Sequence, residues 1–260
     1  MNNCTYEDFK KHVKENPWEY VADLANETED YFVENKEFIC KEDKLTIQKY
    51  NSDVNRKDEH KFILDILPVP FEGDVFNAKI IILTLNPGFV EEVNHKLYNI
   101  LSNEAKKQIT DYHIQNLRLQ CKKIIPNDAV KFIGDRYWFN KTQQFRKENK
   151  FELFEFAIIQ YIGYQSKECN VNKDLEQLKS IEFTGQLLKY IIEKRNDDYC
   201  FIIARNEKFW RKELNKYGTK NKIENHVVIL KNKRNTTISL NNIEDKYKPI
   251  ISRILKQKET

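Results

Sequence analysis

Short apolar runs alternate with longer amphipathic stretches along most of the chain. Four runs rich in Ile, Val and Phe predict strands that are buried on both faces, at residues 79–85, 153–159, 199–204 and 226–230. Helical spacing of apolar residues predicts helices over residues 102–120, 175–194, 207–217 and 243–255. Strands that alternate with helices indicate an α/β protein. We expect a three-layer α/β/α sandwich around a central, four-stranded, mostly parallel sheet.

The first quarter of the chain departs from this alternation. Tyr6, Phe9 and Val13 fall at roughly helical spacing, and a polar stretch follows at residues 49–61. The prolines of Leu67-Pro68-Val69-Pro70 exclude a continuing helix and suggest an extended entry into the main body. We therefore expect residues 1–67 to form a helical, acidic N-terminal extension that packs on a main α/β/α domain of residues 68–260.

Composition narrows the class of protein. The 260 residues suffice for a full hydrophobic core, and no apolar run approaches the ~18 residues that crossing a bilayer requires. No signal-peptide pattern opens the chain. The five cysteines and five histidines are scattered, without a CxxC pair or histidines at i, i+4 spacing. We expect a cytoplasmic protein with no membrane contact, no metal and no other cofactor.

Charge is distributed unevenly although the net charge is only +4. Residues 1–70 carry 10 basic and 16 acidic side chains, whereas residues 205–260 carry 15 basic and 6 acidic ones. A basic C-terminal region favours a surface that faces phosphate groups, and the acidic N-terminal region favours contact with another protein. A general bias toward lysine would give the same basic excess, so both interpretations stay open.

Polar residues follow each predicted strand. Amides, hydroxyls and cations are present there, and carboxylates are absent: the four segments are Asn86-Pro87-Gly88-Phe89, Gln160-Tyr161 with Tyr164-Gln165-Ser166, Arg205-Asn206, and residues 231–237. The carboxyl ends of parallel strands meet at one edge of a sheet, where ligands bind. Amides can read a base edge and cations suit phosphate, so the pattern favours a nucleotide or nucleic acid over a metal. Polar loops without any such function are the alternative.

The segment PFEGDVFNAKIIILTLNPGF, residues 70–89, resembles the lead-in, first strand and water-activating loop of the uracil-DNA glycosylase superfamily. The mismatch-specific uracil/thymine glycosylases are the most similar type, with a loop that reads Gly-Ile-Asn-Pro-Gly. Here Thr84 replaces the first Gly, and Asn86-Pro87-Gly88 is intact. A weaker match at residues 226–239 corresponds to the last strand and DNA loop of that superfamily, where Lys233-Arg234 replace Pro-Ser.

The resemblance covers roughly residues 68–255 and implies hydrolysis of the N-glycosidic bond of a flipped uracil, or of another modified or mismatched base, in DNA. It implies that Asn86 orients the attacking water and that Asn232 stabilises the charge of the leaving base. Phe89, Pro87, Gly88 and Gln160 would contact the base. The residues that would bind the phosphates of single-stranded or mismatched DNA are Lys231, Lys233, Arg234, Thr236 and Thr237.

The sequence allows several alternative interpretations of these motifs and of the function. Asn-Pro-Gly is also a common turn, Phe89 is equally compatible with core packing, and Tyr137-Trp138-Phe139 favours core packing over base stacking. A catalytically inactive member of the fold would act as a nucleic-acid or modified-base binding module. A third alternative is a nucleotide-handling enzyme on a Rossmann-like sheet, but the sequence contains no glycine-rich phosphate-binding loop. Ser166 and His226 lack the partners of a hydrolase triad.

Overall fold

A computed structural model provides the structure of the protein and describes residues 4–13, 15–122, 124, 136–232 and 234–256. Lys233, one of the predicted phosphate ligands, lies outside the described residues. No helix within these ranges combines the length and the apolar character that crossing a membrane requires.

The sheet of the described residues has five strands in the order β1-β3-β2-β4-β5. Their bounds are Phe71–Glu72 (β1), Ile80–Thr84 (β2), Phe156–Gln160 (β3), Cys200–Ile203 (β4) and Val227–Ile229 (β5). Strands β2 to β5 pair in parallel, and β1 pairs antiparallel to β3. The four predicted strands are confirmed, but the expectation of a four-stranded sheet is wrong. The missing strand has only two residues and directly follows Pro70, so it carries no recognisable alternation.

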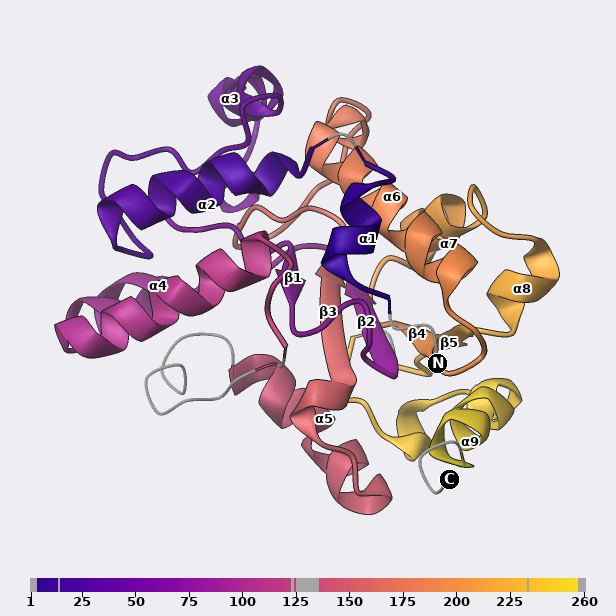
Figure 1. Cartoon of the computed structure of the whole chain (residues 1–260). Coiled ribbons are helices and arrows are strands. Elements are labelled where there is room, and N and C mark those ends of the chain that lie inside the picture. Colours follow the sequence, from indigo (N-terminus) through magenta and orange to yellow (C-terminus); the bar gives the residue numbers. More distant parts are fainter. Residues whose placement is uncertain (1–3, 14, 123, 125–135, 233, 257–260) are drawn as a thin grey trace.

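The helices surround this sheet (Figure 1). They are Tyr6–Lys10 (α1), Pro17–Thr28 (α2), Lys44–Ser52 (α3), Asn103–Leu117 (α4), Arg136–Asn149 (α5), Lys179–Lys194 (α6), Glu207–Leu214 (α7), Lys220–Glu224 (α8) and Lys248–Lys256 (α9), with one π-helical segment at Glu92–Leu97. The four predicted helices are confirmed with shorter bounds. The last one begins only at Lys248, because residues 240–242 and 245–247 form separate 3₁₀ turns.

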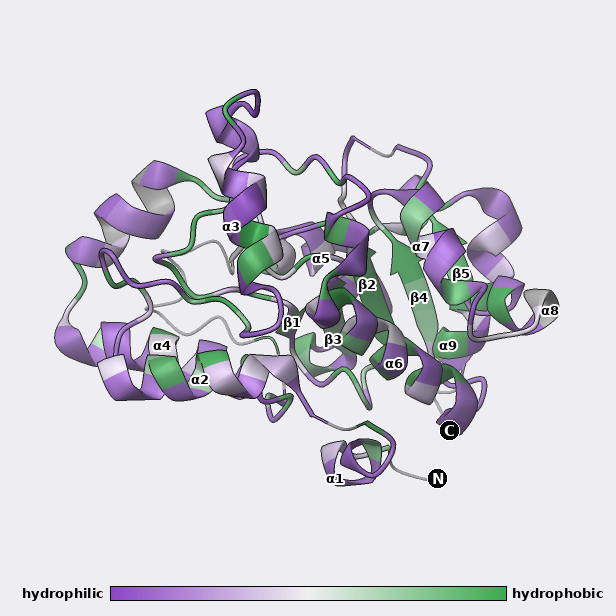
Figure 2. Ribbon diagram, turned by 90° about the horizontal axis from the view of Figure 1, so that it is seen from above, coloured by the Kyte–Doolittle hydropathy of each residue, from purple (hydrophilic) through white to green (hydrophobic). Residues whose placement is uncertain are grey.

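Helices lie on both faces of the sheet, α1, α6 and α7 on one side and α5 and α9 on the other (Figure 1). The rings of Phe183 in α6 and Phe71 in β1 are 6.2 Å apart, and those of Phe145 in α5 and Phe156 in β3 are 6.0 Å apart. Strands covered on both faces are apolar over most of their length, which explains the apolar runs in the sequence and the green strands of Figure 2.

The N-terminal helices share one continuous core with the sheet. Trp18 and Val21 of α2 are buried in the same cluster as the strands, and Asn16 caps α2 while its Nδ2 donates to the Leu117 carbonyl at the end of α4 (2.8 Å). Figure 1 shows α2 alongside α4. The domain boundary at residue 67 stays a prediction.

Candidate functional site

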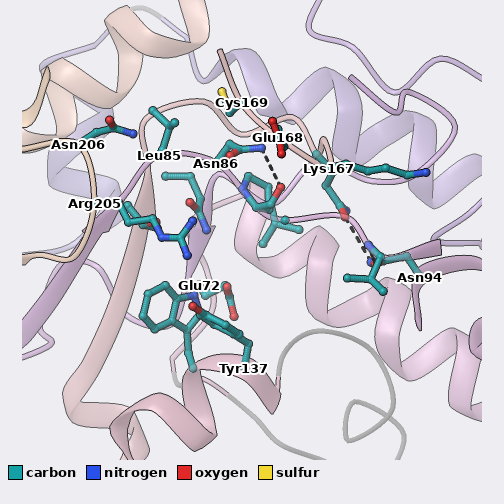
Figure 3. A pocket seen from close by; sticks show the side chains of 18 of the residues that line it. Glu72, Leu85, Asn86, Asn94, Tyr137, Lys167, Glu168, Cys169, Arg205 and Asn206 are labelled. Atoms are coloured by element: carbon teal, nitrogen blue, oxygen red, sulfur yellow. Dashed lines mark hydrogen bonds between the residues drawn. The ribbon is translucent and has the colours of Figure 1, made fainter. Parts of the chain in front are cut away.

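A cavity of about 660 Å³ lies where strands β2 and β3 end. Figure 3 shows Asn86, which follows β2, and Arg205, which follows β4, around the same space as Glu72 of β1 and Tyr137 of α5. The sheet order brings these segments together, because β1, β3, β2 and β4 are neighbours. The cavity therefore occupies the edge at which α/β sheets bind ligands.

Asn86 is held in one orientation at the corner after β2. Its Nδ2 donates to Ser166 Oγ (2.9 Å) and to the Pro87 carbonyl (3.0 Å), and Ser166 in turn donates to the Glu168 carbonyl (2.9 Å). Because the amide nitrogen is occupied, the side-chain oxygen is the atom left to accept a bond from a water or a ligand.

Gly88 closes this corner without needing glycine's conformational freedom. Its φ is not positive, and a Cβ placed on it would meet no atom within 4 Å. The conformational explanation of Asn-Pro-Gly as a turn that needs a left-handed glycine therefore does not apply here. Pro87 and Gly88, which the resemblance assigns to base contact, both line the cavity.

The floor of the cavity comes from three neighbouring strands. Thr84 of β2 and Gln160 of β3 are register partners, and Glu72 of β1 is paired with Ile158, two residues before Gln160. Residues two apart in a strand point to the same face, so Glu72 and Gln160 project from one face of the sheet. Phe156, two residues before Ile158, lies on this face as well, and its ring packs against Phe145 of α5. Helix α5 therefore covers the face that carries Glu72 and Gln160.

Glu72 is an unusual group for this floor. Only 4% of its surface is exposed, and its Oε2 has no hydrogen-bond partner among the described residues. Burial raises the pKa of the Glu72 carboxyl to about 8, while the Tyr112 hydroxyl opposes that shift. The Oε1 of Gln160, itself buried, likewise has no partner among the described residues.

Aromatic side chains form a wall of the cavity. Trp138 is buried, Tyr137 is 41% exposed, and their rings meet edge to face at 5.0 Å. The sequence favoured core packing for this cluster, which describes Trp138 but not Tyr137. Faces of this kind can stack on a base.

The cationic segment after β5 reaches the same wall. The Tyr137 hydroxyl lies 2.5 Å from Thr236 Oγ1, and Thr236 is buried. The corner after β2 and the basic C-terminal loop therefore border connected parts of one region of the surface.

A basic groove of about 810 Å³ adjoins the cavity. Arg205 and Asn206 line both, and the groove continues along Lys208, Arg211 and Arg234. Arg211 pairs with Glu207 and Glu224, but Arg205, Lys208 and Arg234 are exposed and form no ion pair with a described residue.

The groove also contains a helix N-terminus. Asn206 has left-handed backbone dihedrals (φ 55°), and its side chain makes no capping hydrogen bond to the first turn of α7. Together the cations and the helix end favour phosphate.

Some predicted site residues lie elsewhere. Phe89 is 4% exposed and packs edge to face on His95 at 5.0 Å, in agreement with the core alternative. Asn232 accepts from the backbone N–H groups of Arg234 and Asn235, a local turn, and is not among the described residues that line either cavity. Lys231 is paired with Asp245 (3.4 Å).

Thr237 Oγ1 donates to Asn235 Oδ1 (2.8 Å) and is likewise absent from the described lining of both cavities. Of the loop residues predicted to bind phosphate, Arg234 lines the groove and Thr236 contacts the cavity wall.

Glu72 is the residue that sequence reasoning missed. It lies within the segment that carries the resemblance, but the pattern of a two-residue strand does not reveal which face its side chain takes. Its sequence neighbours, Phe71 before it and Gly73-Asp74 after it, do not indicate that its side chain is buried.

Metal or thiol chemistry finds little support at this site. Within the described ranges, no three His, Cys, Asp or Glu side chains cluster as ligands. Cys169 lines the cavity, but burial raises the pKa of its thiol to about 12, so the thiolate nucleophile is scarce at neutral pH.

Comparison of the chain with protein-family models, with curated proteins and with solved structures found no match.

Proposed function

We propose that the chain is a uracil-DNA-glycosylase-like protein of the cytoplasm that hydrolyses the N-glycosidic bond of a flipped uracil, or of another modified or mismatched base, in DNA. The observation that carries the proposal is one cavity that gathers the Asn86 amide, the Gln160 amide and an aromatic wall, and that opens beside a basic groove. In this proposal the helices on both faces of the sheet make up the three-layer α/β/α arrangement of that superfamily.

The cavity suits a base taken out of the stack. A flipped base needs an apolar or aromatic face and a small number of polar groups that read its edge. Trp138 and Tyr137 supply the first, and Gln160 supplies an amide with a donor and an acceptor. The groove beside it supplies Arg205, Lys208 and Arg234 for the phosphates on either side of that base.

Asn86 is the group that would direct water. Its fixed Nδ2 leaves Oδ1 to accept a hydrogen bond from a water that attacks C1′ of the sugar as the bond to the base breaks. The base leaves with the electron pair of that bond and takes up a proton, and the sugar carbon keeps the hydroxyl. An amide is a much weaker base than a carboxylate, so the hydrolysis is expected to be slow.

The test is an alkaline-cleavage assay on labelled single- and double-stranded oligonucleotides that contain uracil, G·U, G·T, hypoxanthine or xanthine. The wild type should form an abasic product on at least one substrate, and Asn86→Ala should reduce the rate about 100-fold or more. Asn55→Ala, an exposed asparagine far along the chain from the corner, is the matched control and should cleave at the wild-type rate.

A second candidate is a base-binding module without catalysis. The observation that favours it is that no buried, ionised carboxylate among the described lining residues is placed to activate a water. Two glutamates line the cavity. Burial raises the pKa of Glu72 to about 8, and the Glu168 carboxylate is exposed and lies beside His60 (3.3 Å). Tight, salt-dependent binding of a base-modified oligonucleotide without any abasic product would establish this second function and exclude the first.

A further inference from the structure

Two side-chain oxygens on the cavity floor lack partners. Oε2 of Glu72 and Oε1 of Gln160 are both buried, with residue exposures of 4% and 3%, and neither has a hydrogen-bond partner among the described residues. An unpaired buried polar oxygen is costly and uncommon in folded proteins. Two of them beside one cavity point to a ligand that supplies the missing bonds.

The sheet register places these two groups together. Glu72 pairs with Ile158, and Gln160 lies two residues further along β3, so the two side chains are diagonal neighbours on one face. Such neighbours are within reach of each other and of a common planar ligand when their side chains are long. Gln160 is also paired with Thr84, next to the Asn86 corner.

The surroundings of Glu72 favour the carboxylic acid over the carboxylate. Glu72 forms no ion pair with a described residue, and an ionised carboxylate without a partner is very costly to bury. A carboxylic acid has one O–H donor and a carbonyl acceptor, so it offers the same kind of pairing as an amide.

We propose that Glu72 is a specificity-determining residue that, with Gln160, pairs with the edge of a flipped base that presents a hydrogen-bond donor beside an acceptor. The inference rests on the proposed function, because it assigns this cavity to a base. Glu72 donates to a carbonyl or ring nitrogen of the base, and the base donates to Oε1 of Gln160. The N3–H and C4=O of uracil and the N1–H and C6=O of hypoxanthine provide such an edge, and a base methylated at that nitrogen does not.

The test measures binding, without turnover, to two oligonucleotides of one sequence. Each carries a single 2′-fluoroarabino nucleotide, which resists cleavage, with uracil as the base in one and 3-methyluracil in the other. The wild type should bind the uracil oligonucleotide about tenfold or more tightly, since the methyl group removes the donor. Glu72→Leu, which keeps most of the side-chain volume, should reduce this ratio to about 1.

Two further variants complete the design. Glu72→Gln restores a neutral donor and acceptor of the same shape and should recover most of the ratio, which a merely structural role of Glu72 would not require. Glu104→Gln, an exposed glutamate in the first turn of α4, is the control and should keep the wild-type ratio. If Glu72→Leu does not fold, as judged by circular dichroism, Gln160→Leu carries the same expectation.

The outcomes separate this inference from the proposed function. A ratio that persists in folded Glu72→Leu or in folded Gln160→Leu, or a wild-type ratio near 1, overturns the inference, even if abasic product forms. Loss of the ratio in Glu72→Gln as well as in Glu72→Leu also overturns it, because the neutral pairing would then be insufficient. A large ratio that depends on Glu72 supports the inference, even where the glycosylase assay finds no product.

Discussion

Two buried carboxyl groups of this protein have similar burial and opposite surroundings. Asp43, before α3, accepts from the Tyr164 hydroxyl (2.9 Å) and from the backbone N–H groups of Lys179 (2.7 Å) and Ser180 (3.4 Å) at the start of α6. Glu72, on the cavity floor, keeps one oxygen without a partner among the described residues. Burial raises the pKa of both carboxyls.

The comparison distinguishes a carboxyl group that stabilises the fold, Asp43, from one that we propose binds a ligand, Glu72. Asp43 joins the N-terminal region to the first turn of α6 through three donors, so its burial is compensated inside the protein. The Tyr112 hydroxyl acts on the Glu72 carboxyl, but Oε2 of Glu72 lacks a partner among the described residues, and in our proposal a ligand completes its hydrogen bonds. Burial and a raised pKa do not by themselves distinguish the two roles, whereas the partners do.

The largest loss of stability upon substitution is expected at Asp43. Asp43→Ala leaves a buried hydroxyl and two helix N–H groups without an acceptor, so it should lower the free energy of unfolding by about 3 kcal/mol. Asp43→Asn, which keeps one oxygen, should lose less. Urea denaturation at pH 7 measures the free energy of unfolding of both variants. A loss below about 1 kcal/mol for Asp43→Ala would show that the hydrogen bonds of Asp43 contribute little to stability.

A pH-dependent effect is expected at Glu72. Its pKa is raised from the ordinary 4.5 to about 8 in the folded protein, so between these values the folded state retains a proton that the unfolded chain has lost. The free energy of unfolding should therefore fall as pH rises through this window, by up to about 1.4 kcal/mol per pH unit, relative to Glu72→Gln.

Other groups near Glu72 do not alter this difference between the two proteins. Tyr137 of α5 and Arg205 after β4 line the cavity, and the Tyr112 hydroxyl of α4 acts on the Glu72 carboxyl. Burial lowers the pKa of His113, next to Tyr112, from 6.5 to about 3, so His113 contributes a slope of the opposite sign between these values. That slope is the same in the wild type and in Glu72→Gln and cancels in the difference. Urea denaturation of both proteins at pH 5 to 8.5 gives the difference. Parallel curves for the wild type and Glu72→Gln would show that Glu72 is ionised like an ordinary glutamate.

A smaller effect is expected in the basic groove. Arg205→Ala with Lys208→Ala removes two exposed cations that have no ion-pair partner among the described residues. If each contacts a phosphate, affinity for a single-stranded oligonucleotide should fall about tenfold, and the slope of log K against log salt should decrease by about 1.4. Lys189→Ala on α6, paired with Glu193, is the control. An unchanged salt slope in the double variant would place the phosphate path elsewhere.

The smallest effect on stability is expected at Gly88. Gly88→Ala adds a methyl group with no atom within 4 Å, so the free energy of unfolding should change by less than about 0.5 kcal/mol while the methyl group takes space at the cavity. Gly163→Ala places Cβ 2.7 Å from Trp18 and should destabilise by about 2 kcal/mol. Equal losses for the two variants would mean that the Gly88 corner is as tightly packed as the core.

The sheet could be predicted from the sequence because its central strands are buried on both faces. The central residues of these runs, 80–83 and 200–204, carry only apolar side chains, and the polar residues that follow the runs, Asn86 and Arg205, lie at the carboxyl edge of the sheet. Asn86 and Gln160 therefore reach the cavity as the sequence predicts. Helix α5 was missed, since its aromatic first turn is followed by a largely polar stretch.

The rest of the candidate site depends on contacts that a local sequence pattern does not reveal. Glu72 reaches the floor because a two-residue strand pairs antiparallel with β3, some 87 residues later in the chain. Asn232 was expected in the site because it follows a strand, but its side-chain oxygen is used by the turn that it begins. Phe89 follows the Asn86 corner and yet turns into the core.

The central claim is that the cavity beside Asn86 and Gln160 receives a base, and the side-chain amide of Gln160 reports on this directly. In protein labelled with ¹⁵N-glutamine, with the Gln160 signals assigned from Gln160→Ala, titration with the fluoroarabino-uracil oligonucleotide should shift the Gln160 NH₂ resonances to saturation. Saturated binding of the same oligonucleotide, measured in parallel by fluorescence anisotropy, with the Gln160 resonances unmoved would contradict the claim.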